Sequence, residues 1–153
     1  MSDSIDEIDR RILMALQRDA AQSLDSLAEQ VHLSRNACWR RVRRLEEDGV
    51  IRGRVAVLDA EKVGVGLSTF IMVRARDHTA EWLGDFRRVV SEMPEITGAY
   101  RMSGDLDYLL RVRVSSVADY DRFYQRLIGK LKASDISASF VMEEIKDTTE
   151  LPV

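Results

Sequence analysis

The sequence predicts an α+β protein of two halves, because the spacing of its apolar residues changes partway along the chain. Residues 3–49 repeat apolar side chains at the three- and four-residue intervals of amphipathic helices. From Leu67 onward, short apolar runs typical of strands alternate with two helical patterns. A chain of 153 residues suits one compact domain or two small ones. We expect a helical domain at residues 1–58, a linker at 59–66 and a mixed domain at 67–153.

Three helices and a hairpin are expected in the first domain. Serine and aspartate side chains accept hydrogen bonds from the unpaired N–H groups of a helix start, so they mark where each helix begins. The expected caps are Asp3 or Ser4, then Ser23, then Ser34. Gly49 ends the third helix, and VIRGRVAVLD at residues 50–59 then alternates apolar and polar residues as a hairpin does. Three helices and a two-stranded wing form the outline of a winged helix-turn-helix.

The second domain follows the order β-α-β-β-α-β. Strands are expected in LSTFIMVRA, EITGAYRMSG, DLDYLLRVRV and ISASFVMEEI, which begin at Leu67, Glu95, Asp105 and Ile136. Helices are expected in HTAEWLGDFRRVVSEM and in SVADYDRFYQRLIGKL, which Ser116 caps. This order is that of the split, ferredoxin-like βαββαβ unit.

Composition argues against several classes of protein. No run of about 18 apolar residues is present, so no transmembrane helix and no membrane partner are expected. The acidic start MSDSIDEIDRR does not resemble a secretory signal, and the single cysteine fits a reducing cytoplasm. We find no metal-ligand spacing, catalytic triad or glycine-rich phosphate loop. We therefore expect a cytoplasmic protein with no catalytic residue, metal or cofactor.

The stretch SRNACWRRVRRLEEDGVIRGR, residues 34–54, concentrates positive charge in an acidic protein. It holds seven arginines against three acidic residues, a local charge of +4, although the whole chain carries −3. On a helix of about 100° per residue, Cys38, Val42 and Leu45 share the inner face, whereas Trp39 lies on the outer face. One interpretation is a solvated face with arginine–glutamate pairs. That interpretation leaves the exposed indole and most of the arginines unexplained.

The alternative that we favour is a recognition helix in the major groove of double-stranded DNA. Arginine binds phosphate or guanine, asparagine pairs with adenine, and the first turn of such a helix reaches base edges. Arginines on the wing would contact the flanking phosphates. The predicted DNA-binding residues are Ser34, Arg35, Asn36, Trp39, Arg40, Arg43, Arg44, Arg52 and Arg54.

The turn SGDLDY, residues 103–108, is the second candidate site. Gly104 permits a tight turn with exposed N–H groups that could hold a carboxylate, and Asp105 and Asp107 could hold an ammonium. Together these groups would suit an amino-acid zwitterion. A plain hairpin turn with solvated aspartates is the alternative.

Four segments of the chain closely resemble the Lrp/AsnC transcription regulators. They are IDEIDRRILMALQRDA, SLAEQVHLSRNACWRRVRRLEEDGVIRGRVAVLD, MSGDLDYLLRVRV and FVMEEIK. The resemblance implies a C-terminal RAM/ACT-like domain that senses small amino acids, and homodimers that assemble into octamers or similar rings. It also implies effector contacts at Ser103, Gly104, Asp105, Asp107 and Tyr108 of the turn and at Ser137 and Ser139. The chain looks most similar to the cysteine-responsive branch, which makes L-cysteine the first effector to consider.

Two other functions stay open. A nucleoid-type protein would organise DNA with little sequence specificity, and a ferredoxin-like domain could carry small-molecule enzyme chemistry. The ratio of specific to non-specific DNA affinity tests the first, and a turnover screen tests the second.

Overall fold

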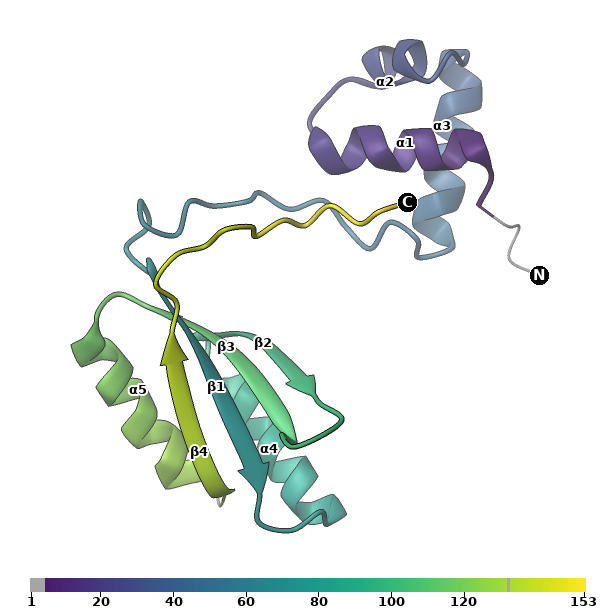
Figure 1. Ribbon diagram of the computed structural model, residues 1–153. Helices are drawn as coiled ribbons and strands as arrows, with labels where there is room; N and C mark the ends of the chain where they lie inside the picture. Colours follow the sequence, from purple (N-terminus) through teal and green to yellow (C-terminus); the bar gives the residue numbers. More distant parts are fainter. Residues whose placement is uncertain (1–4, 132) are drawn as a thin grey trace. The chain divides into compact units, whose positions relative to one another are not determined.

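The structure, a computed structural model, describes residues 5–131 and 133–153 (Figure 1). The chain forms two compact units. One runs to Val57 and takes in Lys146–Val153, and the other spans Leu58–Ile145. The α+β class is confirmed, with a helical first unit and a mixed second unit. In the described ranges, no helix is both long and apolar enough to cross a membrane.

Three helices make up the first unit: α1 (Glu7–Arg18), α2 (Leu24–Gln30) and α3 (Arg35–Glu47). The caps of α2 and α3 are as predicted, since Ser23 Oγ accepts from Ser26 N at 3.1 Å and Ser34 Oγ accepts from Ala37 N at 3.3 Å. The cap of α1 differs. The predicted residues 3 and 4 lie outside the described part of the chain, and Asp6 caps α1 in a reciprocal capping box with Asp9.

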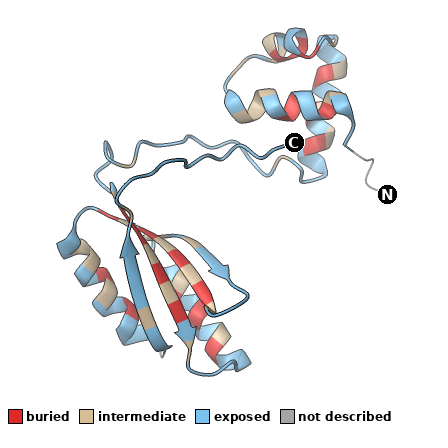
Figure 2. Ribbon diagram, in the orientation of Figure 1, coloured by how far each residue is buried: buried red, intermediate tan, exposed pale blue. Residues whose placement is uncertain are grey.

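Between α2 and α3 the chain turns sharply. His32 adopts a left-handed φ of 57°, and Leu33 N donates to Ala28 O at 2.9 Å. The turn directs one apolar face of each helix inward, as the red segments in Figure 2 show. The buried core consists of Ile12, Leu13, Leu27, Ala28, Val31, Cys38, Val42 and Leu45.

The predicted hairpin at residues 50–59 is not formed. Ile51 still packs on the helical core, and its N–H donates to Leu45 O at 2.9 Å. Beyond it the backbone has no strand, and the side chains of Val55 and Val57 are 82% and 77% exposed. A two-stranded ribbon without apolar cover is marginal in water, and these valines find no cover within the unit.

The second unit contains β1 (Leu67–Ala75), α4 (Ala80–Glu92), β2 (Ile96–Arg101), β3 (Tyr108–Val114), α5 (Val117–Lys130) and β4 (Ala133–Phe140). The antiparallel sheet has the order β2-β3-β1-β4, which is the predicted βαββαβ topology. Both helices pack on the sheet face that carries Ile71, Leu110 and Val112. The opposite face, which carries Phe70 and Met72, is not covered by a helix of its own unit.

The last strand differs from the sequence prediction. Strand β4 covers Ala133–Phe140 rather than residues 136–145, and its pairing with β1 runs from Ala133 opposite Ala75 to Phe140 opposite Thr69. The following tail, which the sequence assigns to the domain at 67–153, packs with the first unit in the structure. There, the Gln17 amide donates to Leu151 O at 3.1 Å and accepts from Leu151 N at 2.6 Å.

Candidate DNA-binding helix and effector loop

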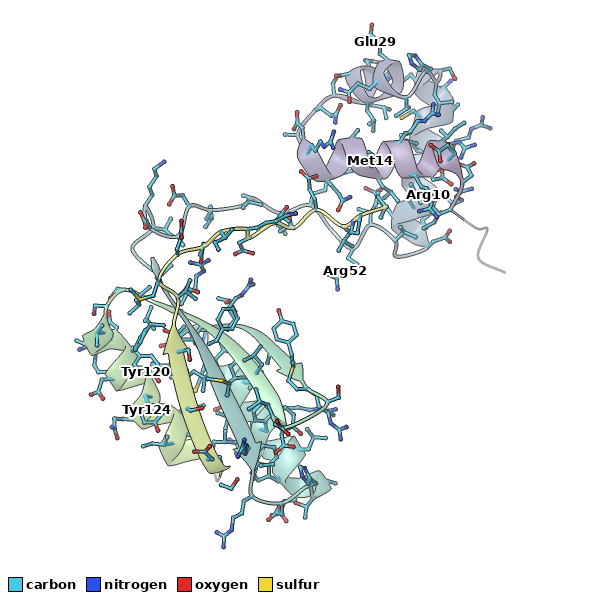
Figure 3. All side chains as sticks on the ribbon, viewed as in Figure 1. Arg10, Met14, Glu29, Arg52, Tyr120 and Tyr124 are labelled. Atoms are coloured by element: carbon cyan, nitrogen blue, oxygen red, sulfur yellow. The ribbon has the colours of Figure 1, made fainter. Side chains whose placement is uncertain are left out.

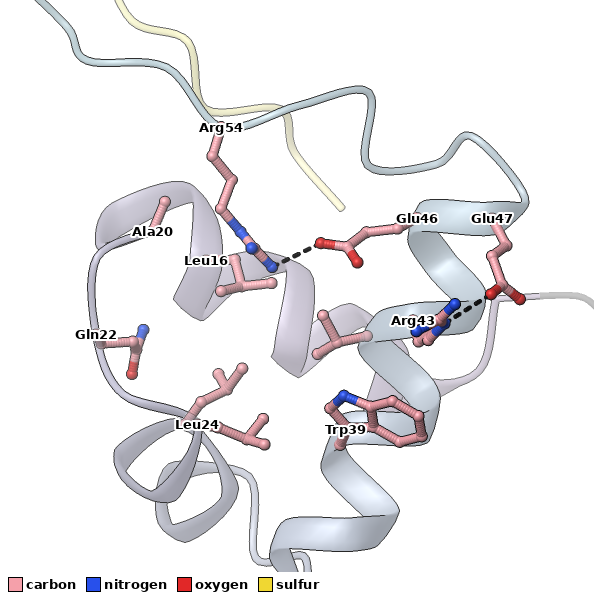
Figure 4. A pocket seen from close by; sticks show the side chains of 11 residues that line it. Leu16, Ala20, Gln22, Leu24, Trp39, Arg43, Glu46, Glu47 and Arg54 are labelled. Carbon is pink, nitrogen blue, oxygen red and sulfur yellow. Dashed lines mark hydrogen bonds and ion pairs between the residues drawn. The ribbon is translucent and has the colours of Figure 1, made fainter.

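Helix α3 presents an aromatic and cationic outer side. The indole of Trp39 is 50% exposed, and the guanidinium carbon of Arg43 lies 5.6 Å from its ring centroid. Both side chains border a hollow of about 520 Å³ in the first unit, shown in Figure 4. The exposed Trp39 therefore belongs to the outer surface and not to the core, as its helical position predicted.

Three of the predicted DNA-binding arginines pair with exposed acidic side chains. Arg35 Nε lies 3.2 Å from Asp25, Arg43 Nε 2.8 Å from Glu47, and Arg54 Nη2 2.8 Å from Glu46. The last two pairs are the dashed lines in Figure 4. Each pair is largely exposed, and such pairs contribute only about 0–1 kcal/mol. A phosphate can therefore replace the carboxylate at small cost.

Arg40 and Arg52 differ from these three. Both side chains are exposed, and neither has an acidic or hydrogen-bond partner within residues 5–131 and 133–153. Arg40 lies on the outer side of α3 next to Trp39, and the side chain of Arg52 extends away from the helices of its unit (Figure 3). Asn36 is exposed in the first turn of α3. A ligand can therefore bind the side chains of Arg40, Arg52 and Asn36 without breaking a contact within the described residues.

Arg41 and Arg44 serve the fold. Asp9 is fully buried, and its carboxylate accepts from Arg41 Nη1 at 2.8 Å and from Arg44 Nη2. Asp6 accepts from the same Arg41 nitrogen at 2.6 Å. A hydrogen bond from the backbone of Asp9, together with that from Arg41, lowers the pKa of Asp6 from 3.8 to about 2. The predicted DNA contact Arg44 thus joins α3 to α1 in this structure.

The conformation of the loop 103–108 requires a glycine at position 104. Gly104 has a φ of +107°, a conformation that side-chain-bearing residues rarely adopt. Met102 N donates to Asp107 O at 2.9 Å and closes the turn. Arg74 Nε donates to Asp105 O at 3.1 Å, so the loop is fastened to the end of β1.

The two predicted ammonium ligands are not equivalent. Asp107 Oδ2 accepts from Ala75 N at 2.8 Å, and its Oδ1 lies 3.8 Å from His78 Nε2. The side chain of Asp105, in contrast, has no partner among the described residues. Asp107 therefore fastens the loop to β1, and Asp105 is the carboxylate left for a ligand.

The remaining predicted effector residues are separated by the sheet. Ser137 and Ser139 pair with Met72 and Phe70 and share the open face with them. Tyr108 pairs with Val73 on the other face, where it is only 6% exposed. One subunit therefore does not bring Tyr108 and the two serines into one pocket.

Sequence reasoning missed three residues that shape these sites. Arg41 was not singled out, although it holds α3 to Asp9; Arg74 and His78 were not connected with the loop. The sequence offered an indication of the role of Arg41, because Asp9 lies in the first turn of α1, where a carboxylate can take part in helix capping. That position does not indicate which arginine the carboxylate of Asp9 pairs with. Within the described ranges, no cluster of three His, Cys, Asp or Glu residues suits a metal ion.

Each half of the chain matches a known protein family. The family model of the Lrp/AsnC ligand binding domain matches residues 68–151, and that of a winged helix-turn-helix DNA-binding domain matches residues 5–52. The DNA-binding transcriptional activator DecR of Escherichia coli strain K12 is 48% identical over 97% of this chain and 99% of its own. The glutamate uptake regulatory protein of Zymomonas mobilis is 46% identical, and the matched region covers 97% of this chain and 91% of that protein.

Two solved structures are similar over nearly the whole chain. The AsnC family transcriptional regulator of Agrobacterium tumefaciens has a TM-score of 0.93 and 52% identity, with 96% of each chain covered. A transcriptional regulator of Neisseria meningitidis, solved in complex with L-Met, has a TM-score of 0.93 and 34% identity, with 97% of each chain covered.

Proposed function

Because the chain belongs to the Lrp/AsnC family of DNA-binding transcriptional regulators, we propose that it binds an operator through α3 and responds to a small amino acid at the loop 103–108. The observation that carries the first part is the outer side of α3. There an exposed indole, an exposed amide and an arginine that has no partner among the described residues lie together.

Each DNA-binding side chain has a role that its chemistry suggests. Asn36, in the first turn, pairs with an adenine edge, and Arg40 binds guanine or phosphate. Arg52 binds the flanking phosphate backbone, which positions the domain without reading sequence. Arg35, Arg43 and Arg54 exchange their carboxylate partners for phosphates when DNA arrives.

The test of operator binding is a titration with the DNA upstream of the protein's own gene, against a scrambled fragment at the same salt concentration. Replacing Arg40 and Arg43 by alanine is expected to abolish specific binding while the oligomer stays intact. Arg76→Ala, which removes one exposed arginine from the second unit, is the matched control and leaves the affinity unchanged. Equal affinity for both fragments would instead favour the nucleoid-type alternative.

The effector is held at the loop by Asp105 and by backbone N–H groups. The Asp105 carboxylate pairs with the ammonium of the effector, and the N–H groups around Gly104 bind its carboxylate. L-cysteine is the first candidate, and L-methionine is the natural comparison because a similar regulator was solved with it. Asp105→Asn is expected to weaken effector binding while it leaves DNA affinity without effector unchanged. An equal loss of both would argue against the loop site.

The complete effector site needs a second subunit. Ser137 and Ser139 lie on a face that no helix of the same unit covers, and the sheet separates them from Tyr108. A homodimer formed through this face, and assembled further into an octamer or a similar ring, would bring loop and serines of different subunits together. An effector that changes this packing would alter DNA affinity through a coupling of about 1–3 kcal/mol. Light scattering with and without the effector tests whether assembly and binding are linked.

A further inference from the structure

A second hollow lies in the second unit, between α4 and the strand β2. Its volume is about 260 Å³, and we call it the edge groove. Its apolar lining comes from Leu83, Phe86 and Val90 of α4 and from Ala99 of β2. Typical pockets for drug-sized ligands measure about 300–1,000 Å³, so the edge groove suits a smaller molecule with an apolar body.

The charge of the edge groove is entirely positive. Arg87 comes from α4 and Arg101 from β2, and no acidic residue belongs to the lining. Neither arginine has an acidic or hydrogen-bond partner in the part of the chain that the structure describes. The neighbouring Arg88, by contrast, lies 3.0 Å from Asp85 and 3.6 Å from Glu92. Two guanidinium groups beside an apolar hollow complement an organic anion.

A tyrosine also contributes to the lining of the edge groove. Tyr108 lines the groove, is 6% exposed, and its hydroxyl has no hydrogen-bond partner among the described residues. Its ring is fixed between Phe86, with centroids 4.2 Å apart, and Trp82, at 5.4 Å. This hydroxyl can therefore donate a hydrogen bond to a molecule in the edge groove without breaking a contact within the described residues.

We propose that the edge groove binds a small organic monocarboxylate that has a branched or aromatic apolar body and no amino group. Arg87 and Arg101 hold its carboxylate, Tyr108 donates a hydrogen bond to it, and the apolar lining covers its body. An amino acid is disfavoured because an ammonium would meet two guanidinium groups and no carboxylate. This separates the edge groove from the loop, where Asp105 supplies the carboxylate that an ammonium needs. The inference does not depend on effector binding at the loop.

Isothermal titration of the full chain with two matched probes tests the proposal. 4-Methyl-2-oxopentanoate and L-leucine share a carboxylate and a branched body and differ in the amino group. We expect the oxo acid to bind and Arg87→Gln or Arg101→Gln to weaken it by about ten- to a hundredfold each. Tyr108→Phe keeps the packed ring and is expected to weaken it less. Arg88→Gln, on the same helix but outside the groove, leaves the affinity unchanged.

Three results would overturn the proposal. The first is no binding of the oxo acid, or of phenylpyruvate as an aromatic acid, at millimolar concentration. The second is binding that Asp105→Asn abolishes while both arginine variants retain it, which places the acid at the loop. The third is L-leucine binding that Arg87→Gln and Arg101→Gln weaken as much as they weaken the oxo acid. If Asp105→Asn abolishes leucine binding and the arginine variants do not, the result bears on the proposed effector loop and not on the edge groove.

Discussion

The carboxylate of Asp9 lies 2.8 Å from the guanidinium of Arg41, although 32 positions separate the two residues. Asp9 sits in the first turn of α1 and Arg41 in the middle of α3, so this contact sets the orientation of the helix proposed to bind DNA. A buried carboxylate is tolerated only when it is paired, and Arg44 supplies the second donor.

The first prediction concerns the stability of this contact. Asp9→Asn keeps the shape of the side chain but removes the buried charge that Arg41 and Arg44 share, while Arg41 keeps its pair with Asp6. We expect a loss of about 2–3 kcal/mol in the free energy of unfolding, measured by urea denaturation of the full chain. Glu7→Gln breaks the exposed pair with Arg11 and is expected to cost less than about 0.5 kcal/mol. Similar losses in both variants would contradict the role given to Asp9.

The second prediction concerns pH. Because the pKa of Asp6 is lowered in the folded protein from 3.8 to about 2, its ionised form stabilises the fold. This contribution is fully present above pH 3.8 and is lost as the pH falls toward 2. We expect Asp6→Asn, which still caps α1, to lower the melting temperature at neutral pH. The difference from the unsubstituted protein should shrink between pH 4 and pH 2, and a difference constant across that window would refute the prediction.

The third prediction separates the arginines that we assign to DNA from those that we assign to the fold. Arg40→Ala is expected to lower the slope of log affinity against log salt concentration by about 1, with unfolding unchanged. Arg44→Ala is expected to lower the free energy of unfolding, because it removes a partner of the buried Asp9. Fluorescence anisotropy over a range of salt concentrations gives the slope, and denaturation gives the stability. A reversed pattern would show that the two roles are misassigned.

The fourth prediction concerns the loop glycine. Gly104→Ala places a side chain at a φ of +107° and is expected to cost about 1–3 kcal/mol. Gly84→Ala in α4 meets no atom within 4 Å and has no positive φ, so it should raise stability by about 0.5–1 kcal/mol. Thermal unfolding of both variants gives the comparison, and destabilisation of equal size in both would contradict it.

Local features of the fold could be predicted because they depend on neighbouring residues. Ser23, Ser34 and Ser116 cap their helices as expected, since a cap needs only an N–H group three residues away. The hairpin at residues 50–59 failed for the opposite reason. Its alternation of apolar and polar residues is local, but a strand pair also needs cover for side chains such as Val55, and that cover is not local.

The candidate sites divide in the same way. The sequence by itself determined the two-part α+β architecture, the outward position of Trp39 and the glycine turn at residue 104, because helical period and backbone sterics act over a few residues. Only the tertiary structure decided that Asp9 engages Arg44 while Arg40 has no partner in the part of the chain that the structure describes, and that the sheet separates Tyr108 from Ser137. The ion pair of Asp9 with Arg44 joins residues 35 positions apart, and the strand register that places Ser137 joins it to the distant Met72. No spacing within one segment specifies such a distant partner.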